Sequence, residues 1–467
     1  MGRRGALTIS NSGSATSSTT ACIAGGGPAG MMLGLLLARA GINVVVLEKH
    51  GDFLRDFRGD TVHPSTLEIL DELGLSTRFH ELPHQKVTRA RAIQGGRTMR
   101  TADFSTLKVR YPYVAMVPQW DFLDLLATEA SRSPHFQLRM NAEAYDVLRA
   151  DGRIVGVRYH DRDGDHDLTA ALTVAADGRH STLRAAVGLS PRDFGAPMDV
   201  VWFRLSRGDA GTAMERGRGT EREVREAREG SGEDDALAMR LGPGYAIVVI
   251  PRPTHWQVAY LIRKGGYDEL RATGIQAFRD RLARVAPFLA DRVTELTSFD
   301  DARFLQVRVD RLRRWHLPGL LFIGDAAHAM SPVGGVGINL AIQDAVAAAN
   351  LLAGPLLRTQ RTGVPLPEAV LAAVQRRRGL PTAATQLFQR AISRVVIRRT
   401  LSAAPAGGEE TEGAAGVQAP AAGAPTGPAP FPPEWLLRLV AGWFARLIGI
   451  GLRPEHVQIR TPPEPDR

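Results

Sequence analysis

Residues 20–48, TACIAGGGPAGMMLGLLLARAGINVVVLE, decide how the first part of this chain folds. The apolar run 20–24 has the composition of a buried strand, and the glycine-rich turn after it opens an apolar helix. A second apolar run, 42–49, follows that helix directly. This order of strand, turn, helix and strand predicts a β-α-β unit with parallel strands.

The turn between the first strand and the helix consists of Gly25, Gly26, Gly27, Pro28, Ala29 and Gly30. Its GxGxxG spacing is typical of a site for a dinucleotide. The first glycine permits a tight turn, the second lets the backbone approach a pyrophosphate, and the third lets helix and strand pack closely. Unpaired N–H groups at the start of the helix would face the phosphates. Glu48 ends the second strand, where it can accept hydrogen bonds from ribose hydroxyls, and Lys49 beside it is a further candidate. The charge of Glu48 disfavours the 2′-phosphate of NADP here, but the turn alone does not separate NAD from FAD.

The composition is that of a globular protein, since 44% of the 467 residues are hydrophobic. No apolar run reaches the roughly 18 residues of a membrane-spanning helix. Residues 1–19 lack the apolar core of a secretory signal, so we expect a disordered leader there. Cys22 is the single cysteine, which excludes a disulfide and a cysteine-based metal site, and we predict no metal site. Its place in the first strand favours a core position, and the composition fits a reducing, cytoplasmic location.

The net charge of +9 comes with 58 basic residues, nearly all of them arginine. These arginines alternate with acids, as in EREVREAREG at 221–230, and do not form a stripe with interleaved aromatic residues. We therefore interpret them as solvated surface and expect no binding of nucleic acid.

Two further motifs follow apolar strands. Asp177 and Gly178 come after LTVAA and are followed by Ser181 and Arg184. The third motif is Gly324-Asp325-Ala326-Ala327-His328 after LLFI, continued by Pro332 and by the glycine-rich stretch 334–339. Together with the glycine turn, these motifs resemble the GxGxxG, DG and GD fingerprints of the para-hydroxybenzoate hydroxylase-like family of single-component flavin monooxygenases. The resemblance covers about residues 20–355.

The resemblance implies an α/β fold with a Rossmann-type FAD-binding domain, built on a parallel sheet, and a substrate domain with a mixed or antiparallel sheet. We divide the chain accordingly into a leader (1–19), the first part of the FAD-binding domain (20–190), the substrate domain (191–300), the closing segment and helices of the FAD-binding domain (301–401), an Ala/Gly/Pro-rich linker (402–433) and a C-terminal helix and tail (434–467). Within the substrate domain we expect strands at 199–207, 245–252 and 255–263, a long loop at 207–237 and an amphipathic helix at 274–293.

The resemblance also implies roles for single residues. Asp177 would lie near the pyrophosphate and Asp325 would bind the ribityl O3′. The segment from Pro332 to Gly337, Ile338 and Asn339 would lie beneath the pyrimidine edge of the isoalloxazine. Arg58 and Gln119 would lie around the FAD phosphates and ribose. The cofactor-binding candidates are Gly25, Gly27, Pro28, Ala29, Gly30, Glu48, Lys49, Arg58, Gln119, Asp177, Gly324, Asp325, Gly337, Ile338 and Asn339.

The chemistry implied by the resemblance is monooxygenation. NADH or NADPH would dock transiently and reduce the non-covalently bound FAD, and O2 would then give a flavin C4a-hydroperoxide. Its distal oxygen would hydroxylate or epoxidise an aromatic, polyketide-like or other apolar small molecule. No catalytic acid or base is demanded, and Arg58 and Pro332 are merely flavin-adjacent candidates. The runner-up is an FAD-dependent reductase of the same fold, of the saturating-reductase type. A halogenase is less favoured, since residues 246–251, AIVVIP, lack both tryptophans of WxWxIP.

Other chemistry-bearing residues have simpler explanations. His328 is interpreted as a packing or hydrogen-bonding residue rather than a base, while His63 could face the flavin. Of Trp202, Phe203, Tyr245, Trp256 and Tyr260, we expect most in the core and some in a substrate-side wall.

Residues 434–451 predict a C-terminal helix. Its apolar face would carry Leu436, Leu439, Val440, Trp443, Leu447 and Ile450, with Glu434 and Arg438 opposite. We expect the helix to pack on the body of the protein or on a second subunit as a homodimer contact. Trp443 and Phe444 also suit a weak contact with a membrane surface, although few arginines lie beside them.

Overall fold

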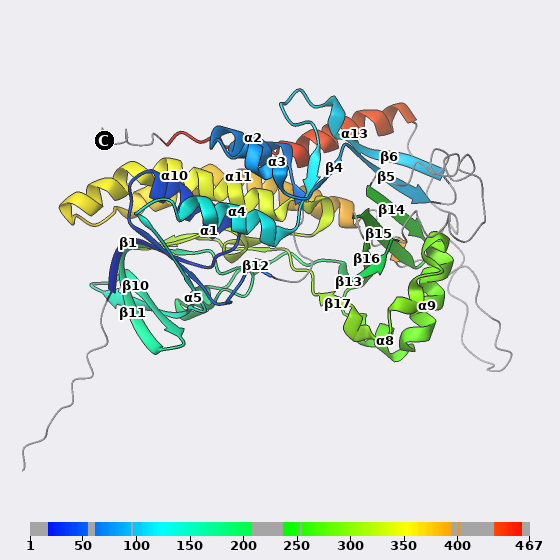
Figure 1. The fold of residues 1–467 in the computed structure, drawn as a ribbon, viewed down its shortest axis with the longest axis horizontal. Helices are drawn as coiled ribbons and strands as arrows, with labels where there is room; N and C mark the ends of the chain where they lie inside the picture. Colours follow the sequence, from blue (N-terminus) through cyan, green and yellow to red (C-terminus); the bar gives the residue numbers. More distant parts are fainter. Residues whose placement is uncertain are drawn as a thin grey trace, which may run out of the picture.

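Two β-sheets set the layout of the chain (Figure 1). The computed structural model describes residues 17–54, 61–94, 97–207, 237–252, 255–394, 400–401 and 434–459. Residues 1–16 of the predicted leader, the centre of the predicted loop at 207–237 and the predicted linker at 402–433 lie outside the described residues. The prediction of a disordered leader is wrong at its last three residues, because Ser17, Ser18 and Thr19 pair with β11 as the start of the first strand.

The larger sheet carries the three motifs. Its main path is β19 (His316–Leu317), β20 (Leu320–Phe322), β11 (Gly164–Ala175), β1 (Ser17–Ala24), β2 (Val44–Glu48) and β8 (Phe136–Met140). The strands from β20 to β8 pair in parallel, as the sequence predicts. An antiparallel pair, β9 (Glu143–Ala150) and β10 (Arg153–Asp161), continues from β11. Every residue of β2 is buried, which explains its unbroken apolar sequence, because a parallel strand has both faces covered.

Helices cover one face of this sheet. They are α1 (Pro28–Arg39), α4 (Gln119–Ala130) and α10 (Gly337–Thr362), with α2 (Pro64–Glu72), α3 (Ser76–Glu81) and α11 (Glu368–Ile392) packed outside them. On the other face, apolar side chains of the β9–β10 pair and Trp315 form a second cluster around Cys22. Cys22 is fully buried, and burial raises the pKa of its thiol to about 12, which confirms its interpretation as a core residue. The short helix α5 (Thr182–Ala186) packs against β9.

Among the described residues, one helical stretch, 333–362, is long and apolar enough to cross a membrane by length and composition. It comprises α10, whose residues from Ile342 to Ala349 are almost fully buried in the core cluster beneath α1. Its apolar character is therefore explained by burial inside the protein.

The second sheet has the order β17 (Arg303–Leu305), β13 (Met198–Ser206), β16 (His255–Arg263), β15 (Tyr245–Pro251), β14 (Leu237–Gly242), β5 (Arg89–Gln94) and β6 (Arg97–Asp103). The three strands predicted in the substrate domain are confirmed as β13, β15 and β16. All pairings are antiparallel apart from β14 with β5. The stretch 89–103, which our division places with the first part of the FAD-binding domain, thus completes the second sheet.

The outer face of the second sheet packs on α8 (Tyr267–Ala272) and α9 (Gly274–Val285), shown at the right of Figure 1. The prediction of one helix over 274–293 is wrong at its end. The helix stops at Val285, and Pro287 begins the short 3-10 helix η2 (Pro287–Leu289), followed by η3 (Val293–Glu295) and η4 (Phe299–Asp301). Proline has no N–H for the helical ladder and restricts the residue before it, so the amphipathic pattern continues past the point where the helix can.

Two small sheets connect the larger ones. The first pairs β3 (Thr61–Val62), β7 (Val114–Met116) and β4 (Gln85–Val87), and the second pairs β12 (Arg192–Asp193), β18 (Asp310–Arg311) and β21 (His328–Ala329).

The C-terminal helix α13 (Glu434–Gly449) packs on β6 and on the 3-10 helix η1 (Phe104–Thr106), as Figure 1 shows. The expectation that it packs on the body is confirmed. Its predicted face is wrong at Trp443, which is 58% exposed, whereas Ala441 and Ala445 are buried. Small residues face inward because the helix lies close to its neighbours, and Trp443 instead packs edge-on against Phe388 of α11. Leu447 is buried, as predicted.

Candidate functional site

The three sequence motifs meet at the carboxyl edge of the large sheet. Gly25 has a φ of 106°, and a Cβ there would lie 2.4 Å from the carbonyl oxygen of Ala176, the residue before the DG motif. Gly324 of the GD motif packs between Ala29 and Ala341, each 3.2–3.3 Å from where its Cβ would be. Motifs that lie some 300 residues apart in the sequence are thus in van der Waals contact.

The glycine turn is tight on one side and open on the other. A Cβ on Gly30 would lie 1.9 Å from the carbonyl oxygen of Gly25, so this position has no room for a side chain. By contrast, no described atom lies within 4 Å of a Cβ on Gly27. Pro28 begins α1, and the N–H groups of Ala29 and Gly30 belong to its first turn, where an α-helix offers no acceptor. This leaves a backbone surface with free donors beside an open space.

Glu48 lies against this turn, as the sequence predicts. Its Oε2 accepts a hydrogen bond from Gly26 N at 2.8 Å, and its side chain is 2% exposed. Its Oε1 accepts from His50 N at 3.0 Å and lies 2.7 Å from His50 Nδ1. The sequence analysis does not single out His50, although its place two residues after the strand's last residue is a usable signal. Lys49 is half exposed, with Nζ 3.9 Å from Glu143.

The DG motif supplies a buried carboxylate. Asp177 Oδ2 accepts from Leu183 N at 3.2 Å and from Thr182 Oγ1 at 3.3 Å, while its Oδ1 is buried without a hydrogen-bond partner in the described part of the chain. Burial raises the pKa of Asp177, and hydrogen bonds from Ser181 and Leu183 oppose that rise. A buried acceptor of this kind costs free energy unless it receives a hydrogen bond.

The GD motif faces the DG motif across an ion pair. Asp325 Oδ2 lies 3.3 Å from Arg179 Nη2, and the two side chains are 29% and 22% exposed. Arg184 links the same two motifs, donating to the carbonyl oxygens of Ala326 at 2.8 Å and Arg179 at 2.7 Å. Arg179 is a second residue that the sequence analysis missed, because a loop arginine gives no spacing signal.

His328 is a structural residue, which confirms its interpretation. It is 1% exposed, and its Nε2 lies 2.6 Å from Asp344 Oδ2. Asp344 also accepts from Gly324 N at 3.1 Å and from Arg378 Nε at 3.1 Å. Burial by itself would raise the pKa of Asp344, but the charges and hydrogen bonds of His328 and Arg378 outweigh burial and lower it. This buried network holds the GD turn on α10.

The segment between Pro332 and Asn339 forms the third side of the site. Gly334 and Gly335, with φ values of 80° and 63°, make a turn in the left-handed region just before α10. No described atom lies within 4 Å of a Cβ on Gly337, and the N–H groups of Gly337 and Ile338 begin the helix. A second open space therefore meets a helix N-terminus.

Asn339 connects this segment to the strand β3 and the helix α2. Its Nδ2 donates to the carbonyl oxygens of Thr61 at 3.1 Å and Gly335 at 3.2 Å. Its Oδ1 accepts from His63 N at 2.9 Å and from Thr66 Oγ1 at 2.8 Å. The side-chain amide is fully used within the protein, so any contact of Asn339 with a cofactor would come from its backbone.

These features fit an FAD along this edge. The residues provide two open backbone surfaces at helix N-termini, at Gly27 and at Gly337, and an unpartnered buried acceptor at Asp177. Gln119 begins α4 with its side chain half buried. Arg58 lies outside the described residues.

Comparison with known proteins agrees with this geometry. The FAD binding domain family matches residues 18–364. 6-Methylpretetramide 4-monooxygenase of Streptomyces rimosus is 31% identical over 362 residues, which are 77% of this chain and 80% of that protein. The chain belongs to the para-hydroxybenzoate hydroxylase-like family of FAD-dependent monooxygenases. FAD is its cofactor.

One further relative and one solved structure are also similar to this chain. Rifampicin monooxygenase of Streptomyces venezuelae is 29% identical over 334 residues, which are 69% of this chain and 61% of that protein, so the match spans less than two thirds of that enzyme. PqsL of Pseudomonas aeruginosa, solved with 2-aminobenzoylacetate, shares the fold with a TM-score of 0.65 at 21% identity, over 82% of this chain and 98% of PqsL.

In this flavoprotein, the inner face of the second sheet looks toward the Pro332–Asn339 segment. Of the five aromatic residues considered on its strands, Trp202 packs with Val248 against the inner clusters that include Val333 and Val336. Phe203, Tyr245, Trp256 and Tyr260 belong to the outer cluster with α8 and α9. Side chains alternate between the faces of a strand, which separates Trp202 from its neighbour Phe203.

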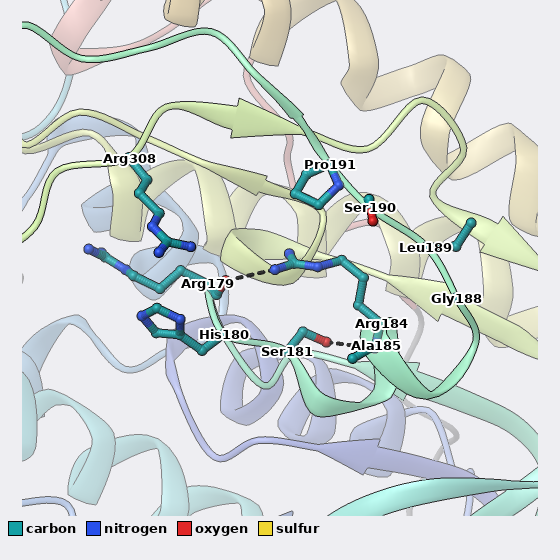
Figure 2. Close-up of a pocket in the computed structure, with 10 residues that line it drawn as sticks. All are labelled: Arg179, His180, Ser181, Arg184, Ala185, Gly188, Leu189, Ser190, Pro191 and Arg308. Carbon is teal, nitrogen blue, oxygen red and sulfur yellow. Dashed lines mark hydrogen bonds between the residues drawn. The ribbon is translucent and has the colours of Figure 1, made fainter.

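A basic pocket of about 490 Å³ opens beside the DG motif (Figure 2). Arg179, His180 and Arg308 line it on one side, and Ser190 and Pro191 line it on the other. Figure 2 shows the side chains of Arg179, His180 and Arg308 gathered together, with the side chain of the buried Arg184 beside them. Such a concentration of positive charge suits a phosphate-bearing ligand.

We predict that Gly27→Val folds normally and loses FAD. The open space at Gly27 accepts a branched side chain without displacing described atoms, but that side chain would occupy the path of the pyrophosphate. Gly30→Ala is the matched comparison, because its Cβ would clash with the Gly25 carbonyl and should destabilise the fold itself. Thermal unfolding of the apoproteins and an absorbance titration with FAD measure the two effects separately. Retention of FAD by a folded Gly27→Val variant would contradict this placement of the pyrophosphate.

We also predict that His63 makes stability depend on pH. Burial lowers the pKa of His63 to about 4 from 6.5, against the hydrogen bond to the Ile448 carbonyl, which raises it. Between these pH values the unfolded chain binds more protons than the folded one, so the free energy of unfolding falls as the pH is lowered through this window, by about 3 kcal/mol in all. His63→Asn should flatten the dependence measured by chemical denaturation. His255, whose pKa burial also lowers to about 4, is present in both proteins, so the difference between them isolates His63. Equal slopes in the two proteins would argue against the buried neutral state.

Proposed function

We propose that this protein is an NAD(P)H-dependent monooxygenase that transfers one oxygen atom from O2 to an aromatic, polyketide-like small molecule. The observation that carries the proposal is the convergence of the GxGxxG, DG and GD motifs beside the apolar inner face of the second sheet. The relatives named for 6-methylpretetramide and rifampicin support a polycyclic substrate class.

We assign the cofactor contacts from the geometry, apart from that of Arg58, which lies outside the described residues and is assigned from the family resemblance alone. The turn from Gly25 to Gly30 and the start of α1 would hold the pyrophosphate, with Arg58 and Gln119 near the phosphates and ribose, and Glu48 would accept from the ribose after turning from Gly26 N. Asp177, through its unpartnered Oδ1, would receive a donor near the pyrophosphate. Asp325 would bind the ribityl chain from its place opposite Arg179. Pro332, Gly337, Ile338 and Asn339 would lie along the edge of the ring system.

Bound and reduced, FAD would supply the electrons that activate O2, from which one oxygen atom is transferred to the substrate. The protein contributes position, charge and exclusion of water. The positive end of α10 and the N–H groups of Gly337 and Ile338 would stabilise negative charge on a ring system bound beside them. Trp202 and Val248 offer an apolar wall on which a flat substrate can lie. No side chain is required as an acid or base in this arrangement.

The basic pocket beside the DG motif is our candidate for docking of NADH or NADPH. Its guanidinium groups on Arg179 and Arg308 can pair with the phosphates of a dinucleotide, and the pocket adjoins the site through the Arg179–Asp325 ion pair. The competing function is a reductase of the same fold, which would use the same cofactor and pocket but transfer no oxygen to substrate.

The decisive experiment measures NAD(P)H consumption by the FAD-loaded protein against a panel of phenols, anthracycline-like and tetracycline-like polyketides and quinone precursors. We expect one polycyclic class to accelerate consumption and to give a product with one added oxygen atom. Isotope-labelled O2 identifies the source of that atom. Saturated product without label would favour the reductase, and peroxide alone with every compound would count against the proposed substrate class.

Arg308→Gln tests the docking pocket. Removing one guanidinium should raise the KM for NADPH by roughly tenfold, with little change in FAD affinity. A tenfold change corresponds to about 1.4 kcal/mol, which is typical of one charge-assisted hydrogen bond. Arg97→Gln, an exposed arginine on β6, is the matched control. An unchanged KM in Arg308→Gln would place the nicotinamide dinucleotide elsewhere.

A further inference from the structure

The C-terminal strap (residues 441–459) lies beyond the part of the chain that the FAD binding domain family matches, yet it contacts the core of the site. Ala445 is fully buried and Ile448 is 8% exposed. With Phe444 they join the cluster that contains Met330, Val336, Leu340 and, from the second sheet, Ile250. The strap therefore packs between the second sheet and the start of α10, in the cluster to which Trp202 also belongs.

Ile448 fits against the glycine turn before α10. Its Cδ1 lies 2.7 Å from where a Cβ on Gly334 would be, so the bare backbone of Gly334 is in contact with this side chain. On its other side the turn contacts Thr61, whose Oγ1 donates to the Gly335 carbonyl at 2.8 Å. The turn is thus held between Ile448 and Thr61.

His63 joins the strap to the start of α10 by hydrogen bonds. The Nδ1 of His63 donates to the Ile448 carbonyl at 2.7 Å, and its backbone N donates to Asn339 Oδ1 at 2.9 Å. Asn339 in turn donates to the Gly335 carbonyl. The end of α13, the start of α2 and the start of α10 are therefore joined around the turn by one chain of bonds.

The far end of the strap is anchored by a buried acid. Glu455 is 4% exposed and accepts from Arg377 at 2.7 and 3.0 Å and from Arg378 at 3.3 Å. Arg378 also donates to Asp344, which holds the GD turn. The backbone N of Glu455 donates to Gln343 Oε1 at 2.5 Å. Both ends of the strap thus connect to segments that we assign to the flavin.

We propose that the strap positions the flavin site: Ile448 and Glu455 hold the Gly334–Gly335 turn and the start of α10 in the conformation that binds the ring system. The inference rests on the proposed placement of FAD along this segment. In this proposal, only one conformation of the turn binds the ring system well, and the docked strap favours that conformation. Docking of the strap and binding of FAD therefore stabilise each other, and this coupling is reciprocal. Ile448 and Glu455 are positioning residues and need not touch the substrate.

The experiment uses the full chain and FAD alone. Ile448→Ala and Glu455→Gln should each raise the FAD dissociation constant by about fivefold or more, the lower end of typical coupling between sites. They should also shift the visible circular dichroism of the bound flavin toward that of free FAD. Ile448→Val should retain most of the FAD affinity and of the circular dichroism of the bound flavin. It serves as the graded variant if Ile448→Ala does not fold. Arg446→Gln, exposed on the same helix, is the matched control.

Hydrogen exchange gives an independent readout. By reciprocity, FAD should slow exchange of the amides at 445–457 in the wild-type protein, and less so in Glu455→Gln. Unchanged FAD affinity and flavin spectrum in both folded variants, or exchange in the strap that ignores FAD, would overturn the proposal. None of these measurements needs NAD(P)H or a substrate. A protein that binds FAD but oxygenates nothing on the panel would therefore refute the proposed function and leave this inference standing.

Discussion

The contact between Gly30 and the carbonyl group of Gly25 is the constraint on which the rest of the site depends. A Cβ on Gly30 would lie 1.9 Å from the carbonyl oxygen of Gly25, so α1 lies so close to the end of β1 that only glycine fits at this position. That approach places the first turn of α1 beside the ends of β11 and β20, where the DG and GD motifs follow. Three segments with separate sequences can then present their backbone donors and carboxylates to one elongated ligand.

Local physical signals made the architecture predictable. A buried parallel strand has to be apolar on both faces, so β1, β2, β11 and β20 stand out as apolar runs followed by glycine or acid. Runs rich in β-branched and aromatic residues likewise identify β13, β15 and β16 in the second sheet. The helix at 274–293 fails at Pro287, where a backbone rule overrides side-chain periodicity.

Contacts between residues far apart in the sequence could not be predicted from the sequence. Arg179 reaches Asp325, and Thr61 reaches the turn at Gly335, through loops that carry no periodic signal. Asn339 has the right position for the flavin segment, but its side chain is consumed by bonds to β3 and α2. The burial of Ala441 and Ala445 in place of Trp443 reflects the closeness of α13 to β6, which no pattern within the helix encodes.

The second sheet collects its strands from two separate stretches, 89–103 and 198–305, so it has no contiguous gene segment of its own. A single crossover between these two stretches, in a recombination between relatives, would take β5 and its parallel neighbour β14 from different parents. Exchange of the whole second sheet, whose inner face we propose as the substrate wall, therefore requires two coordinated replacements. Point substitutions on the inner face, around Trp202 and Val248, offer evolution a shorter path to a new substrate than exchange of the whole unit.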